Sequence, residues 1–355
     1  MTSLERAHGW AGPGKTGARP PASRARRGRA RRRVVAMMTS QDPGFLRRAT
    51  DQFQFADPLS AQRTSDIART FLAGYNILAS GAGPAAVTSA AAGVPRYFRP
   101  FFYEGAAMGF GPLCWHTGGH IGAFEGFARA LSPATVYQNY VGLGWWLGTI
   151  YRRRPRRIAR IVSVLDFRYR LLCYEGMGFR AGFLSAGRRM APAGVRVTDS
   201  AATDVWYQGY GRSLWFVHMG DVAGAIRAAT AVGAAHAADC VSGIGLGVAF
   251  SYLDRITDLE RACRQVPRHL LAEFEQGLSF GWEARQLADP DLFDRHAAAL
   301  PPAVRRAVGT AVASVQQARD RLALDGDESD FYVRWRREVV EVMRGAPVFP
   351  PSPVK

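Results

Sequence analysis

Residues 174–182 read YEGMGFRAG, and a similar order of residue types occurs five more times along the chain. In each segment a polar or small residue precedes an anchor glycine, and small and apolar residues come after it. The other segments are YEGAAMGFG (103–111), YVGLGWWLG (140–148), YQGYGRSLW (207–215), VSGIGLGVA (241–249) and EQGLSFGWE (275–283). The anchors Gly105, Gly142, Gly176, Gly209, Gly243 and Gly277 are spaced by 37, 34, 33, 34 and 34 residues. A fixed period of this length indicates a repeat protein.

Two looser units flank these six. Gly74, in FLAGYNIL (71–78), lies 31 residues before Gly105, and Gly309, in AVGTAVAS (307–314), lies 32 residues after Gly277. With them, the array would run from about residue 65 to about residue 340.

Small residues also stand two positions after the anchors and, in four of six units, four positions after them. Residues four apart lie on one face of a helix, so the pattern gives each helix a smooth stripe that another backbone can approach closely. A glycine inside a helix costs about 1 kcal/mol relative to alanine. We therefore expect the glycines in mid-helix, at tight contacts between helices.

The second half of each unit also reads as helix. Segments 221–237, 258–266 and 290–300 have apolar residues at spacings of three and four. Asp221, Asp258 and Asp289 stand at helix starts, where N-caps or first-turn acids belong, and Pro290 suits the first helical position. The predicted fold is therefore all-α: an array of about seven helical hairpins, similar to tetratricopeptide or Sel1-like superhelices.

Glycine-rich segments also occur in phosphate-binding loops and in membrane helix dimers, and both fit this chain less well. A phosphate-binding loop needs a preceding strand and, in the Walker type, a lysine, and neither is present. A membrane dimer motif needs an apolar helix, but Glu104, Glu175 and Arg212 interrupt these segments, and no stretch reaches about 18 apolar residues. We therefore predict no spanning segment.

Charged residues are distributed unevenly along the chain. The net charge is +17, and residues 1–36 hold ten Arg or Lys against one acid, with no apolar periodicity. We predict residues 1–38 to be a disordered basic extension that lies upstream of the native start, a solvated tail or a nucleic-acid-binding arm, of which we discount the last. Residues 39–345 should form one repeat domain and 346–355 a disordered tail. The four cysteines, none of them in C-x-x-C spacing, predict a reduced, cytoplasmic protein.

The repeated blocks resemble a known family. FYEGAAMG (102–109), NYVGLGWWLG (139–148), YEGMGFRAGF (174–183), GYGRSLWFVHMGDV (209–222), DCVSGIGLGVAFSY (239–252) and YVRWRRE (332–338) look like the UnbL-type family, a bacterial domain of unknown function found in enediyne polyketide gene clusters. The resemblance covers about residues 44–340. It implies a cytoplasmic accessory protein of antibiotic biosynthesis and assigns no catalytic residue. Family members often carry a histidine near the position of Asn139, so any role of that histidine is absent here.

Two carboxylates are candidates for chemistry. Glu104 and Glu175 stand directly before their anchors, a position that Gln208 and Gln276 fill in two other units. If buried, these groups need hydrogen-bond partners, which is the structural interpretation. The functional alternative is a pair of carboxylates inside the array that acts as acid and base or holds a ligand.

Candidate ligand contacts are Tyr103, Trp145, Tyr174, Arg212 and Trp215, which lie on or beside the glycine faces. Aromatics there, including Trp146, Phe179, Phe250 and Trp282, form either core or a cavity wall. Arg212 is either an ion-paired strut or an anion site, and Asp239 should neutralise such an arginine. His116 and His120 lack a third ligand nearby, so we predict no metal and no cofactor.

A dense basic run, YRRRPRRIARI (151–161), lies between two glycine helices. It is either a solvated helix face or a docking site in which Arg152, Arg153, Arg154, Arg156 and Arg157 bind an acidic partner. In the polyketide context implied by the resemblance, that partner would be an acyl carrier domain, alongside other enediyne accessory proteins. Aromatics are not interleaved as nucleic-acid binding would require, so we predict no nucleic-acid partner.

Two hypotheses of function follow. In the first, the scaffold holds a polyene intermediate or its carrier during formation of the enediyne core. In the second, the protein is a cyclase or isomerase that acts on a polyene in an aromatic-lined cavity, with a glutamate as acid or base. A closed apolar pocket with both glutamates inside would favour the enzyme, and a filled core with an outer groove would favour the scaffold.

Overall fold

The computed structural model describes residues 41–42, 44, 49–185 and 199–349, and within them every regular element is a helix. The predicted all-α array is thereby confirmed. Its assignment to the tetratricopeptide or Sel1-like type remains a prediction. The predicted basic extension, residues 1–38, and the side chain of Asp258 lie outside the part of the chain that can be described.

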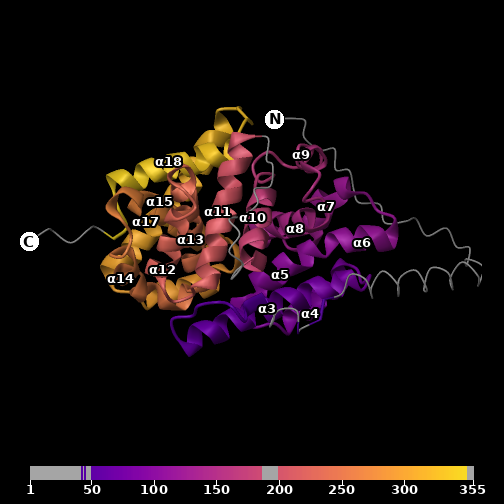
Figure 1. Ribbon diagram of the computed structural model, residues 1–355, viewed down its shortest axis with the longest axis horizontal. Helices are drawn as coiled ribbons and strands as arrows, with labels where there is room; N and C mark the ends of the chain where they lie inside the picture. Colours follow the sequence, from indigo (N-terminus) through magenta and orange to yellow (C-terminus); the bar gives the residue numbers. More distant parts are fainter. Residues whose placement is uncertain (1–40, 43, 45–48, 186–198, 350–355) are drawn as a thin grey trace, which may run out of the picture.

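Seven glycine-bearing helices pack side by side in chain order (Figure 1). These "array helices" are α3 (Pro58–Ala79), α5 (Arg99–Met108), α8 (Val136–Ile150), α10 (Leu172–Ser185), α11 (Ser200–Val217), α13 (Ala234–Ser251) and α15 (Leu271–Ala288). Shorter connectors join them: α4 (Pro84–Ala92), α6 (Phe110–Thr117), α7 (Phe124–Leu131), α9 (Pro155–Val162), α12 (Val222–Thr230) and α14 (Leu259–Cys263). Another short helix, α16 (Pro290–Ala298), follows the last array helix. Short 3-10 elements are η1 (Arg96–Phe98), η2 (Ile121–Ala123), η3 (Pro133–Thr135), η4 (Leu253–Asp258) and η5 (Arg268–Leu270).

Acidic caps set several helix starts. Asp57 accepts the backbone N–H of Ser60 at the start of α3, and Asp199 accepts that of Ala201 at the start of α11. Asp221 and Asp289 cap α12 and α16, and Pro290 follows at the first helical position, as predicted. Such caps satisfy backbone donors that have no partner within the helix.

Glycine carries the contacts between array helices. A Cβ placed on any of eleven glycines would lie between 1.8 and 2.1 Å from a backbone carbonyl oxygen of the neighbouring helix. These are Gly74, Gly105, Gly142, Gly144, Gly176, Gly178, Gly209, Gly211, Gly243, Gly245 and Gly277. The predicted placement of Gly142, Gly176, Gly209 and Gly243 in mid-helix, at contact surfaces, is confirmed.

The contacts are reciprocal. Gly209 faces the carbonyl of Glu175, three residues before Gly178, and Gly178 faces the carbonyl of Trp206, three residues before Gly209. The same relation holds at five of the six interfaces between successive array helices, and at the sixth Ala107 replaces one glycine of the pair. The hydrogen that glycine carries in place of Cβ thus points at a carbonyl oxygen, which is the geometry of Cα–H···O contacts.

This register corrects both flanking units of the predicted repeat. Gly74 pairs with Gly105 in the way that Gly144 pairs with Gly176, so it stands two positions after the true anchor, which is Leu72. Gly309 lies in α17 (Pro302–Leu324) with no atom of another element within 4 Å of its added Cβ. Its surroundings are open, so the glycine contacts end at α15.

The array closes on itself. The α3 hydroxyl of Ser60 shares a hydrogen bond of 2.6 Å with Tyr252, and Arg63 forms an ion pair of 2.7 Å with Asp254, both just beyond α13. Arg285 in α15, 2 % exposed, donates to the Tyr97 carbonyl and to that of Phe250. The N-terminal and C-terminal parts of the array therefore meet around a shared interior, in place of an open concave groove.

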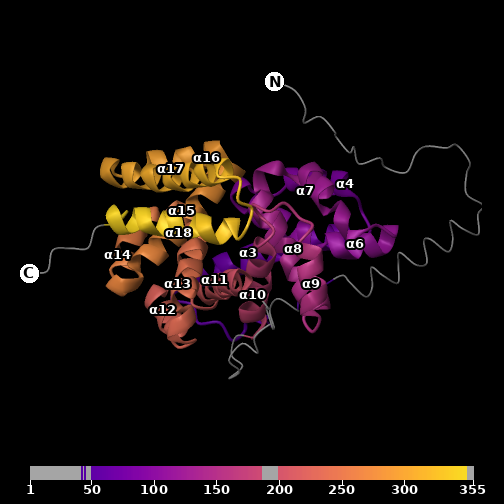
Figure 2. The same ribbon diagram turned by 90° about the horizontal axis from the view of Figure 1, so that it is seen from above.

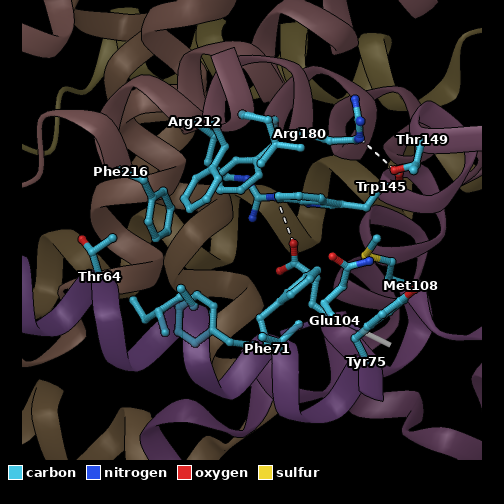
Figure 3. Close-up of a pocket in the computed structure, with 18 residues that line it drawn as sticks. Thr64, Phe71, Tyr75, Glu104, Met108, Trp145, Thr149, Arg180, Arg212 and Phe216 are labelled. Atoms are coloured by element: carbon cyan, nitrogen blue, oxygen red, sulfur yellow. Dashed lines mark hydrogen bonds and ion pairs between the residues drawn. The ribbon is translucent and has the colours of Figure 1, made fainter. Parts of the chain in front are cut away.

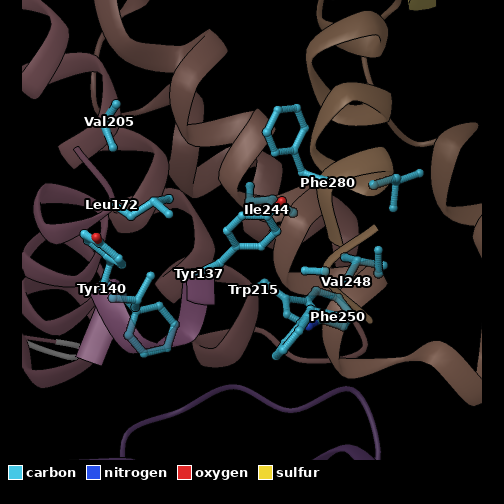
Figure 4. Packing of buried hydrophobic residues seen from close by; sticks show 14 of the residues in the cluster. Tyr137, Tyr140, Leu172, Val205, Trp215, Ile244, Val248, Phe250 and Phe280 are labelled. Carbon is cyan, nitrogen blue, oxygen red and sulfur yellow. The ribbon is translucent and has the colours of Figure 1, made fainter. Parts of the chain in front are cut away.

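That interior is a continuous aromatic and aliphatic core (Figure 4), in which Trp215, Phe250 and Phe280 lie among the packed helices. Two longer helices complete the C-terminal end, α17 and α18 (Phe331–Gly345), which lie side by side over α15 (Figures 1 and 2). Trp335 of α18 is fully buried, and its indole N–H donates to the Val315 carbonyl at 2.7 Å.

The described part of the predicted disordered tail is packed. Val348 and Phe349 are buried and donate their backbone N–H groups to Glu275 at 3.1 and 3.0 Å. The domain therefore reaches past residue 345, because these two apolar side chains cover the core. Among the described helices, none combines the length and apolarity that crossing a membrane requires. All four cysteines are free thiols, and three of them are buried.

Candidate functional site

One face of the array helices lines two internal cavities. Counted from the anchor, the residues one before, three after and seven after it point to this interior. The lining residues at these positions are Phe71, Tyr75, Glu104, Met108, Val141, Trp145, Thr149, Glu175, Phe179, Phe183, Arg212, Phe216, Leu246, Phe250, Phe280 and Ala284. Because these positions lie one turn apart, they form a single stripe on each helix, next to the glycine stripe.

The first cavity has a volume of about 270 Å³ (Figure 3). Its wall is mostly apolar, and four array helices contribute the aromatic side chains of Phe71, Trp145, Phe179, Phe183 and Phe216. Exposed Thr149 and half-buried Arg180 mark its mouth, whereas the buried pair of Glu104 and Arg212 closes its inner end. A concave apolar site with few polar groups is the usual form of a small-molecule site.

Arg212 joins the two candidate glutamates. Its Nε lies 2.6 Å from Glu175 Oε1, and its Nη2 lies 3.3 Å from Glu104 Oε1. The guanidinium carbon stands 4.2 Å from the centre of the Phe179 ring. All three charged side chains are at most 5 % exposed, so α5, α10 and α11 meet at a buried cluster of two carboxylates and one cation. The ion pairs fit the strut interpretation of Arg212, whose guanidinium also lines a cavity, and the anion-site interpretation stays a prediction.

Burial dominates the protonation of this cluster. It raises the pKa of Glu175 to about 7 and also raises the pKa of Glu104, while Arg212 opposes both changes. Burial lowers the pKa of Arg212, but the two glutamates outweigh it and the net change is upward. One cation thus faces two carboxylates, and the mutual repulsion of the carboxylates adds to the pKa of Glu175. A proton on Glu175 near neutral pH would leave one carboxylate for one arginine.

A second, smaller cavity of about 30 Å³ lies on the other side of the cluster. Glu104 and Arg212 line both cavities, whereas Glu175 lines only the second, with Tyr332 and Phe280 across from it. The Glu104–Arg212 pair therefore separates the two spaces.

The remaining polar residues before the anchors are hydrogen-bonded to one another, but the buried Nε2 of Gln276 has no partner among the described residues. Tyr332 donates to Gln208 at 3.1 Å, Gln208 donates to Ser242 at 3.1 Å, and Ser242 donates to Gln276 at 2.7 Å. This chain crosses α18, α11, α13 and α15 inside the core. The structural interpretation of this position therefore holds for Gln208 and, in Gln276, for the side-chain carbonyl alone.

The other predicted ligand contacts are dispersed. Trp145 and Arg212 line the first cavity, but Tyr103 and Tyr174 line neither it nor the second. Trp215 borders a third pocket, and its indole N–H donates to Ser251 at 2.7 Å. Trp146 and Trp282 are core residues. Asp239 pairs with Arg336 at 2.8 Å, as predicted for an arginine partner.

The basic run lies beside the mouth of the first cavity. Arg152, Arg153, Arg154, Arg156 and Arg157 are exposed at the start of α9. Arg157 stands over the Tyr151 ring at 4.4 Å, and the charge of Arg152 acts on Arg180 at the cavity mouth. The described residues contain no cluster of three or more groups able to hold a metal ion. His116 is instead hydrogen-bonded through Nε2 to the Ala79 carbonyl at 2.7 Å.

Sequence reasoning missed most of the cavity wall. Phe183 and Phe216 stand seven positions after their anchors, and Phe71 and Tyr75 become part of the stripe only when Leu72 is the first anchor. The repeat alignment itself holds this signal, because the same columns can be followed through every unit. The placement of Arg180 had no such signal.

Residues 27–343 match the model of a family described as "Protein of unknown function (DUF1702)". The chain belongs to the DUF1702 family. The match spans nearly all of the described array, so the DUF1702 assignment covers the cavities and the buried cluster together. No curated protein and no solved structure matches the chain.

Proposed function

We propose that this DUF1702 protein is an accessory protein of enediyne polyketide core biosynthesis that encloses the apolar polyene part of an intermediate in its first cavity. The enediyne context comes from the resemblance to the UnbL-type family. The observation that carries the binding role is the aromatic wall formed by Phe71, Trp145, Phe179, Phe183 and Phe216. Flat conjugated chains pack well against aromatic rings, and burying apolar surface gains about 25 cal/mol per Å².

The shape of the interior supports enclosure rather than binding on an outer groove. The superhelix closes through the Arg63–Asp254 pair, so the inward face of the array helices is sheltered from water. At the inner end, the Glu104–Arg212 pair offers fixed charge beside the Phe179 ring. A ligand that extended to this depth would place its far end against the only charged groups at the base of the described cavity.

A carrier can deliver such a chain from the neighbouring basic run. Five exposed arginines at the start of α9 lie next to the mouth, and acyl carrier domains are acidic as a class. We propose that they dock there, chiefly to accelerate association, so added salt should weaken the interaction. Charge reversal at Arg152, Arg153 and Arg154 should abolish carrier binding in a titration, while reversal at Arg305 and Arg306 on α17 should not. Equal effects of both variants would contradict the docking site.

The binding role is tested by filling the cavity. Ala68 lines it from α3, whereas Ala73 on the same helix is exposed. Ala68→Phe should reduce binding of a fluorescent conjugated tetraene by more than about tenfold, since the new ring occupies the ligand's space. Ala73→Phe is the matched control and should bind normally. Thermal unfolding of both variants separates lost binding from lost fold. Tight tetraene binding by a folded Ala68→Phe protein would refute the proposal.

A second function is favoured by one observation. Glu104 and Glu175 both lie inside the array, and burial keeps the pKa of Glu175 at about 7, a value suited to general acid or base catalysis. An isomerase or cyclase would use a carboxyl group at the bound polyene, and of the two glutamates Glu104 lines the first cavity while Glu175 stands behind the pair. Metabolite profiling of a deletion strain complemented with Glu104→Gln or Glu175→Gln decides between the two. An enzyme would lose its product while still binding the tetraene; a binding protein with either variant would restore the wild-type products.

A further inference from the structure

Within the described residues, the mouth of the first cavity carries a cation with no acidic partner. Arg180 of α10 lines the cavity, and its Nε donates to the Thr149 hydroxyl at 2.8 Å (Figure 3). No carboxylate in the part of the chain that the structure describes forms an ion pair with it, in contrast to Arg212 at the other end of the cavity.

The surroundings of Arg180 disfavour the charged form of its guanidinium. Burial lowers its pKa, and the neighbouring charge of Arg152 lowers it further. The segment that follows α10, residues 186–198, contains three arginines and no aspartate or glutamate, so it cannot supply the missing anion. A half-buried arginine beside another arginine is stabilised when an anion binds between them.

The cavity below the arginine is apolar. From the mouth inward, the wall passes from Thr149 and Arg180 to Trp145, one turn earlier on α8, and then to Phe179 and Phe216. Trp145 is 8 % exposed, and its indole N–H has no acceptor among the described residues. An oxygen at one end of a ligand would therefore meet two donors on neighbouring helices, the Arg180 guanidinium and the Trp145 indole N–H. The rest of the ligand would lie against the aromatic side chains deeper in the cavity.

We propose that the occupant of this cavity is an amphiphile whose anionic end, a carboxylate or a phosphate, binds Arg180 while its apolar chain lies along Trp145 and Phe179 toward the Glu104–Arg212 pair. This inference rests on the proposed binding function and adds the chemistry and direction of the ligand. The chain enters tail first, and its charged end stays at the mouth, where the basic run of α9 is also found.

Matched probes test the end group. A conjugated tetraene fatty acid, the alcohol with the same chain, and a long-chain monoalkyl phosphate that competes with them are titrated against the full-length protein. Arg180→Gln should weaken binding of the acid about tenfold and leave the alcohol within about twofold, because only the charged contact is lost. Arg180→Lys should retain most of the affinity. Arg160→Gln, which removes an exposed charge from α9, is the control and should leave all three unchanged.

The outcomes separate the two proposals. If only the acid responds to Arg180→Gln, the end group is a carboxylate; if only the phosphate responds, the ligand is a phosphate ester. If the acid and the alcohol bind equally well before and after the substitution, the assignment of Arg180 is wrong while the apolar binding function stands. If the unaltered protein binds none of the probes, both proposals fail.

Discussion

The array helices and the C-terminal pair α17 and α18 pack in opposite ways. Between α10 and α11, Gly178 and Gly209 bring two backbones into direct contact, and any Cβ at these positions would collide with a carbonyl group. Between α17 and α18, contact is made by large side chains such as Trp335, which reaches back to the Val315 carbonyl. Glycine in the array is therefore a structural part of each interface, whereas a Cβ added to Gly309 in α17 would meet no atom of another element within 4 Å. Glycine is therefore required by a helix contact in the array, but not in α17.

The largest difference in the free energy of unfolding is expected between alanine substitutions at Gly209 and at Gly309. A Cβ on Gly209 would lie 1.8 Å from the Glu175 carbonyl oxygen, so Gly209→Ala should lower the free energy of unfolding by more than about 4 kcal/mol or prevent folding. Gly309→Ala should raise it by up to about 1 kcal/mol, because alanine favours the helix and space is open. Urea denaturation measures both. Similar destabilisation by the two substitutions would remove the distinction between the regions.

The second largest loss of stability is expected when Arg212 is replaced. Arg212→Met leaves Glu104 and Glu175 buried without a cation, which should cost about 3–5 kcal/mol in unfolding free energy at neutral pH. The loss should shrink at low pH, where both carboxylates are protonated. The control is Arg212→Met combined with Glu104→Gln and Glu175→Gln, which should recover most of the stability in the same denaturation assay. An equal loss in the triple variant would mean that the packing of the arginine, and not its charge, matters.

The C-terminal pair should be destabilised when a large side chain is truncated, because α17 and α18 contact each other through side chains and not through glycine. Trp335→Phe removes the indole N–H that donates to Val315 and leaves a small gap, at a cost of about 1–3 kcal/mol. Tryptophan at exposed position 115 is the control, and Trp115→Phe should change the unfolding free energy by less than about 0.5 kcal/mol. Thermal unfolding distinguishes the two. A negligible effect at Trp335 would show that α18 is not held by its large side chains.

The smallest effect concerns the link between the two regions. Glu275 of α15 accepts the backbone N–H groups of Val348 and Phe349, and burial raises its pKa to about 7 from the ordinary value of 4.5. Because the folded state holds this proton more tightly than the unfolded state, the contribution to stability is complete below about pH 4.5 and is lost as the pH rises through about 7. Glu275→Gln should flatten the decline in stability between these values, by on the order of 1 kcal/mol. An unchanged slope in denaturation curves across this pH range would contradict the assignment.

The sequence was enough to predict the helices and the position of the glycines, because both follow from periodicity within about 34 residues. It also placed Glu104 and Glu175 in one column. The meeting of both with Arg212 was not predictable, since Glu104 lies 108 residues from Arg212 and only the curvature of the array brings α5 to α11. The position of Arg285, buried where the ends of the array close, depends on the same curvature. Spacing within the sequence determines which helices are neighbours, but the curvature of the whole array determines which residues meet across its interior.

The reciprocal glycine–carbonyl contacts have a consequence for sequence change. Neighbouring helices approach through main-chain atoms at the glycine stripe, and the side chains one before, three after and seven after the anchor, such as Trp145 and Phe179, pack against one another beside it. Substitutions such as Trp145→Leu or Phe216→Val would therefore enlarge the cavity while leaving the glycine–carbonyl contacts in place, at the stability cost of a large-to-small change. A protein built in this way can change which ligand its cavity accepts through point mutations, while the arrangement of its helices is kept.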